Sequence, residues 1–89
     1  MASSKVPVSN GPDKADLLRA VTNPDEHLHV MFDTAADPLE AHLDSIEEVG
    51  VDGVTFGLKG HVVSGNLRGA VFSGIYDSSA RTGTLVFRQ

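Results

Sequence analysis

The second half of the chain alternates apolar and polar residues, and this pattern constrains the fold more than any other feature of the sequence. Val54, Phe56, Leu58 and Val62 occupy alternate positions. Such spacing is typical of a strand with one buried face. Glycines recur through the same region, at positions 53, 57, 60, 69, 74 and 83. Because glycine inside a strand marks a bulge, a bend or a close approach of two backbones, we expect a strongly bent sheet.

Two more strands are expected after the first. Leu67–Asp77 is a long apolar segment, and Thr82–Arg88 places Leu85 and Phe87 on one face. Residues 64–66 and 78–81 have the composition of turns. The three strands therefore predict an antiparallel meander.

The first half of the chain predicts two helices and one strand. Met1–Gly11 has no apolar periodicity, so we expect a flexible tail. Pro12 and Asp13 open a short helix with an apolar stripe. His27–Asp33 alternates with period two and predicts a half-buried strand.

The second helix is expected over residues 37–50. Asp37 would be its N-cap, Pro38 its first residue and Gly50 its C-terminal stop. Its apolar residues recur at helical spacing, at Leu39, Leu43, Ile46 and Val49.

These elements predict a single α+β domain over residues 12–89, in the order α-β-α-β-β-β. Two helices would pack on one face of a bent, mixed four-stranded sheet, and a right-handed crossover would make the strands at 27–33 and 51–63 parallel. Two alternatives stay open. One is an open barrel of the C-terminal strands, and the other divides residues 51–63 into two strands.

Composition restricts the class of protein. The chain has 89 residues and no cysteine, which excludes disulfides and zinc–thiolate sites. No apolar run is long enough for a membrane helix and the N-terminus lacks a signal-peptide pattern, so we expect a cytoplasmic protein. The net charge is −5, yet residues 12–52 hold eleven acids and two bases, whereas residues 53–89 hold four bases and one acid. This asymmetry favours an electrostatically steered partner or self-association.

Histidines suggest one candidate site. His27 and His29 lie on the same face of the expected strand, a spacing that can chelate a divalent metal. His61 or His42 would supply a third ligand and Asp33 a carboxylate. The predicted set is His27, His29 and His61, and it would serve a small metal- or ligand-binding protein or enzyme.

Nucleic-acid binding is a third hypothesis. Lys59, Arg68, Arg81 and Arg88 would supply the positive charge, and Phe72 and Tyr76 would supply stacking rings. The negative net charge opposes this hypothesis. Gly57–Gly60 matches the GxxG string of RNA-binding clamps, but its flanks are expected to be strands rather than helices.

The interpretation we favour is a non-enzymatic protein-binding or assembly module without a resident cofactor, since no motif specifies a reaction. Leu67–Asp77 is apolar on both faces, with Phe72 and Tyr76 on one and Val71 and Ile75 on the other. Helices can cover only one face of the sheet, so we expect the other to form a homodimer interface.

Overall fold

The computed structural model describes residues 3–22, 29–35, 38–65 and 67–89, and within them one helix and six strands. The helix is α1 (Lys14–Thr22). The strands, in chain order, are β1 (Ser3–Val8), β2 (His29–Phe32), β3 (Leu39–Glu48), β4 (Thr55–Ser64), β5 (Val71–Asp77) and β6 (Thr82–Arg88).

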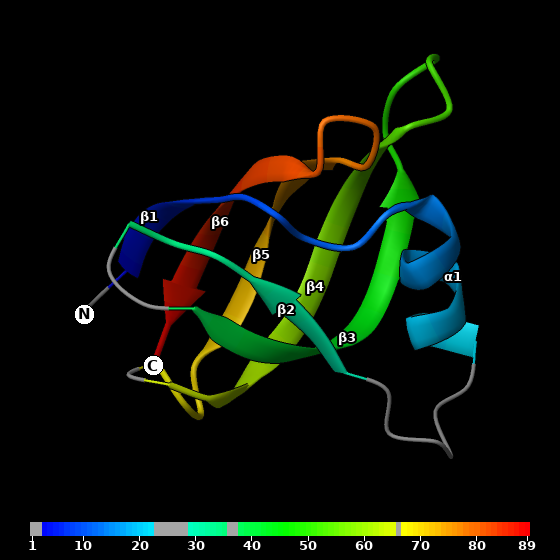
Figure 1. The fold of residues 1–89 in the computed structure, drawn as a ribbon. Coiled ribbons are helices and arrows are strands. Elements are labelled where there is room, and N and C mark those ends of the chain that lie inside the picture. The colour runs from blue at the N-terminus through cyan, green and yellow to red at the C-terminus, as the bar shows by residue number, and fades with distance from the viewer. Residues whose placement is uncertain (1–2, 23–28, 36–37, 66) are drawn as a thin grey trace.

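The six strands form one sheet in the order β1-β6-β5-β4-β3-β2, and every neighbouring pair is antiparallel. The sheet curls into a half-barrel (Figure 1). Just beyond its two outermost strands, β1 and β2, Ser9 and Asp33 exchange two backbone hydrogen bonds of 2.8 Å. This bridge draws the two ends of the sheet together, so one face encloses the core and the other faces outward.

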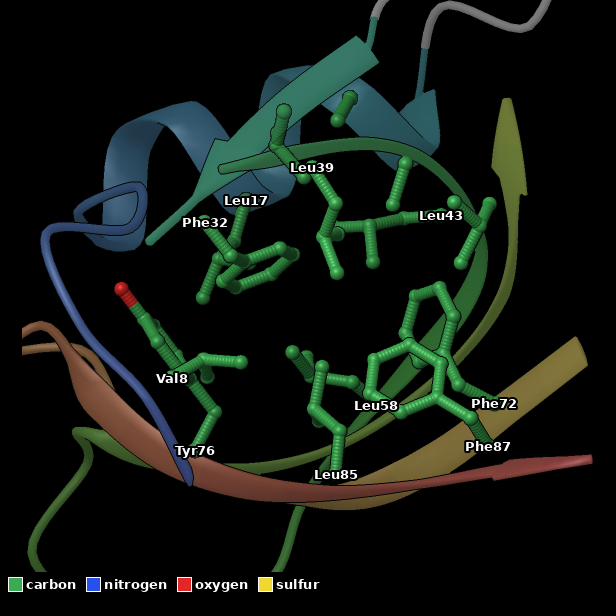
Figure 2. Close-up of a cluster of buried hydrophobic side chains, with 14 of the residues drawn as sticks. Val8, Leu17, Phe32, Leu39, Leu43, Leu58, Phe72, Tyr76, Leu85 and Phe87 are labelled. Carbon is green, nitrogen blue, oxygen red and sulfur yellow. The ribbon is translucent and has the colours of Figure 1, made fainter. Parts of the chain in front are cut away.

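The inner face and α1 build the hydrophobic core (Figure 2). Phe32 lies edge-on to Phe72 and Tyr76, at ring-centroid distances of 6.5 and 5.6 Å. The Tyr76 hydroxyl donates a hydrogen bond of 2.7 Å to the carbonyl of Pro12, which satisfies the one polar atom of that buried ring. Further core residues are Val8, Val30, Leu39, Ala41, Leu43, Phe56, Leu58, Val62, Ala70, Leu85 and Phe87.

Helix α1 begins as the sequence predicts. The Asp13 carboxylate accepts a hydrogen bond of 2.9 Å from the backbone amide of Asp16, which is the geometry of an N-cap. Leu17 and Ala20 are buried, and the helix packs on β2 and β3. The apolar stripe predicted for this helix comprises Ala15, Leu17, Leu18 and Val21, and of these Ala15 and Leu18 are exposed instead.

Glycines on the inner face permit the tight curvature of the sheet. A side chain at Gly60 would collide with the backbone carbonyl of His42 on β3 and with the ring of Phe72 on β5. A side chain at Gly74 would collide with the carbonyl of Thr84 on β6. Neighbouring backbones approach these two positions so closely that only glycine fits.

The predicted architecture of two helices on a mixed four-stranded sheet is therefore wrong. The described strands are all antiparallel, so the expected parallel crossover between residues 27–33 and 51–63 is absent from them. The alternative of a barrel made from the C-terminal strands alone is also wrong, because β1, β2 and β3 supply half of the sheet. Residues 55–64 form one strand, not two.

Residues 39–48 form strand β3 where a helix was expected. Leu39, Ala41 and Leu43 point inward at period two, and a register shift between Leu43 and Ser45 then adds one residue to the strand. Such a bulge moves the next core-facing residue to Ile46, which packs against the core. Period two interrupted by one bulge places Leu39, Leu43 and Ile46 at the spacing of a helix. Asp37, the expected N-cap, lies outside the described residues.

The expected flexible tail also differs from the structure. Ser3–Val8 is strand β1 and pairs with β6 along its whole length. Val8 is buried and Val6 packs against the core. Pro7 obscures this strand in the sequence, and β1 is the outermost strand of the sheet, where proline is tolerated.

Candidate functional site

Strand register aligns three histidines on the outer face of the sheet. His29 on β2 pairs with His42 on β3, and His42 pairs with His61 on β4. We call these three residues the histidine row. Their rings are neighbours, with centroid distances of 5.9 Å between His29 and His42 and 5.1 Å between His42 and His61.

Two carboxylates of β3 contact the histidine row. Asp44 Oδ2 lies 3.3 Å from His61 Nδ1, and Asp44 Oδ1 lies 3.7 Å from His42 Nε2. Glu40 Oε2 lies 2.5 Å from His29 Nδ1. Asp44 is the extra residue of the β3 bulge, and the bulge places its carboxylate between the two imidazoles. With neutral imidazoles, the cluster carries two negative charges, which favours a cation nearby.

The sequence-based metal set overlaps this cluster only in part. His29 and His61 lie at the two ends of the histidine row, whereas His27 lies outside the described residues. Asp33 is elsewhere, where it bridges to Ser9 and accepts a hydrogen bond of 2.7 Å from the Asn10 amide. Among the residues that the structure describes, no three histidine, aspartate or glutamate side chains already converge on one metal position.

Histidine 42 and the two carboxylates are the site residues that sequence reasoning misplaced or missed. On the expected helix, His42 would face the sheet, and Glu40 and Asp44 would lie on a solvated acidic face. On β3, all three lie on the outer face, beside His29 and His61. The signal that could have found them is the period-two spacing of Glu40, His42 and Asp44 themselves.

Strand β5 presents its two apolar faces to different surroundings. Phe72 and Tyr76 point into the core and are 4% and 0% exposed. Val71 and Ile75, which we call the apolar pair, point outward and are 51% and 53% exposed. Of the four residues expected at an interface, only the apolar pair is available to a partner.

The apolar pair adjoins two shallow hollows of the outer face. One has a volume of about 530 Å³ and extends across β4 and β5, from β3 on one side to β6 on the other. Its lining includes Asp44, Lys59, Val71, Val86 and Arg88. The other is about 280 Å³, and there Ile75 lies opposite Gly57, which has no side chain to cover it. The outer face therefore combines exposed apolar groups with charges of both signs.

The features that suggested nucleic-acid binding are separated. Phe72 and Tyr76 are buried in the core, so neither ring can stack on a base. Gly57–Gly60 lies inside strand β4, not in a loop between helices. Arg81 is held in the turn after β5, where its Nε donates a hydrogen bond of 2.6 Å to the Gly11 carbonyl.

Comparisons with protein-family models, with curated proteins and with solved structures find no match for this chain. In the part of the chain that the structure describes, no helix is both long enough and apolar enough to cross a membrane.

Proposed function

We propose that the protein is an assembly module that self-associates through the outer face of β4, β5 and β6. The observation that carries this proposal is the apolar pair, because Val71 and Ile75 are half exposed near the middle of the sheet. Exposed β-branched residues grouped on one sheet face, next to hollows that a partner can fill, are characteristic of interaction surfaces.

Charge favours a second copy of this chain as the partner. Asp44 and Glu47 lie on β3, to one side of the apolar pair, whereas Lys5 and Arg88 lie on β1 and β6, to the other side. In a face-to-face dimer, a twofold axis parallel to β5 and above the outer face exchanges these two sides. The acidic side of one copy then faces the basic side of the other, as an isologous interface requires.

Sedimentation equilibrium over a hundredfold range of concentration, at low and high salt, tests the proposal. We expect a species of twice the 9.4 kDa chain mass at the higher concentrations. High salt should weaken association without abolishing it, because salt screens the charge pairs but leaves apolar burial intact.

A matched pair of variants locates the interface. Ile75→Lys should weaken dimerisation at least tenfold, since it buries a charge on the face. Val51→Lys changes another β-branched apolar residue, which is fully exposed in the loop between β3 and β4, and it should leave dimerisation unchanged. A monomer under every condition, or association that Ile75→Lys does not affect, contradicts the proposal.

A further inference from the structure

The histidine row and its carboxylates gather metal-binding groups on three adjacent strands. Directly opposite residues of an antiparallel pair have Cβ atoms about 4.5–5.5 Å apart. Two such pairings run from His29 through His42 to His61, so the three side chains share one patch of the outer face. Imidazole and carboxylate together suit zinc, copper and nickel, whereas magnesium and calcium prefer oxygen ligands alone.

We propose that His42, His61 and Asp44 bind a divalent transition metal, and that the ring of His29 turns toward them as the fourth ligand. Ligand atoms about 2.0–2.1 Å from a tetrahedral zinc lie about 3.4 Å from one another. The distances of 3.3 Å from Asp44 to His61 and 3.7 Å from Asp44 to His42 bracket this separation.

Small side-chain rotations complete the coordination. In the structure, one oxygen of Asp44 faces His61 and the other faces His42, so the ligand atoms do not yet share a common point. The side chains of His42, His61 and Asp44 are 19%, 43% and 55% exposed. They belong to the outer face, so they can turn without disturbing the core.

Histidine 29 is oriented by a second carboxylate. Its Nδ1 contacts Glu40, so Nε2 is the ring nitrogen that lies outside this contact. Metal-binding histidines commonly pair their other nitrogen with a carboxylate in this way, because the pairing fixes the ring and increases its basicity. His29 lies edge-on to His42, on the side of the row away from His61.

Zinc titration of the full chain tests the site by calorimetry and by NMR of the histidine rings. We expect saturable binding of one zinc per chain, with shifts at the rings of His29, His42 and His61. His42→Ala, His61→Ala and Asp44→Asn should each weaken zinc binding at least tenfold, and calcium or magnesium in excess should not compete. Far-ultraviolet circular dichroism establishes that each variant is folded.

Two control variants distinguish this site from binding by a nearby carboxylate and from the predicted site at His27. Glu47→Gln removes a nearby carboxylate on the same strand and should leave zinc binding unchanged. His27→Ala removes the one histidine of the predicted metal set that the proposed site does not use, and it should also leave zinc binding unchanged. Zinc binding that is unsaturable, that survives His42→Ala, or that is lost in His27→Ala overturns the proposal.

The metal site goes beyond the proposed self-association, and the two can fail separately. Ile75→Lys, the variant expected to weaken dimerisation, should bind zinc with unchanged affinity and stoichiometry. Loss of zinc binding in that variant would show that the metal lies between two copies and would overturn the site within one chain.

Discussion

The two faces of the same sheet differ in the feature of the sequence that determines which side chains lie together on them. The inner face needs only that a side chain be apolar and point inward, so Phe56, Leu58 and Leu85 reach the core by alternation alone. The outer face depends on which residue lies opposite which. His42 acquires its surroundings from His29 and His61, on two other strands. Alternation therefore specifies a core, whereas register specifies a site.

The largest expected effect comes from replacing adjacent residues of β5 that point to opposite faces. Phe72→Ala should reduce the free energy of unfolding by about 3–5 kcal/mol, because it leaves a cavity in the core. Val71→Ala, one residue earlier and on the outer face, should change it by less than about 0.5 kcal/mol in dilute protein. Urea denaturation measures both. Equal effects would mean that β5 does not separate the two faces.

The ionisation of Tyr76 measures how well the inner face of the sheet is buried. Burial raises the pKa of its hydroxyl from 10.0 to about 12. Because the pKa is raised, protonated Tyr76 stabilises the folded protein, and this contribution is complete below pH 10. Between pH 10 and 12 the free energy of unfolding falls by about 1.4 kcal/mol per pH unit. Tyr76 is the only tyrosine and the chain has no tryptophan, so absorbance of the phenolate follows this residue alone.

The matched variant for this alkaline effect is Tyr76→Phe. It should remove the steep loss of stability above pH 10 and also the hydrogen bond to Pro12. Ionisation of Tyr76 near pH 10 in the folded protein would contradict its burial.

Aspartate 77, on the outer face at the end of β5, is expected to give the smallest effect on stability. Its pKa is shifted by hydrogen bonds rather than by burial. Hydrogen bonds from the Ser79 hydroxyl and from the amides of Ala80 and Ser79 lower the pKa of its carboxyl. The resulting stabilisation is present above the ordinary carboxyl pKa and is lost as the pH falls through the lowered value. In an NMR titration, Ser79→Ala should raise the pKa of Asp77. An unchanged titration would show that the turn does not hold the carboxylate.

Local patterns of the sequence predicted the elements that depend on local chemistry. The bounds of β6 and the N-cap of α1 at Asp13 agree with the sequence, as does the antiparallel meander of β4, β5 and β6. Val30 and Phe32 are buried, as the alternation of that strand predicts. The glycine pattern indicated a bend, and the sheet is curled.

Elements that depend on distant partners could not be predicted in the same way. Strand β1 is short of apolar residues and is stabilised by pairing with β6, at the other end of the chain. The bulge at Asp44 gives β3 the spacing of a helix, which removed His42 from the predicted outer face. The sequence therefore predicted His29 and His61 as ligands and His42 as an alternative ligand, but it did not predict the carboxylates of Glu40 and Asp44.

The claim on which both proposals rest most directly is that residues 39–48 form a strand between β2 and β4. NMR of the backbone tests it, through the carbon chemical shifts of these residues and through-space contacts between strands. We expect extended-strand shifts from Leu39 to Glu48 and contacts between His42 and both His29 and His61. Helical shifts over this segment, without those contacts, would contradict the half-barrel and the histidine row together.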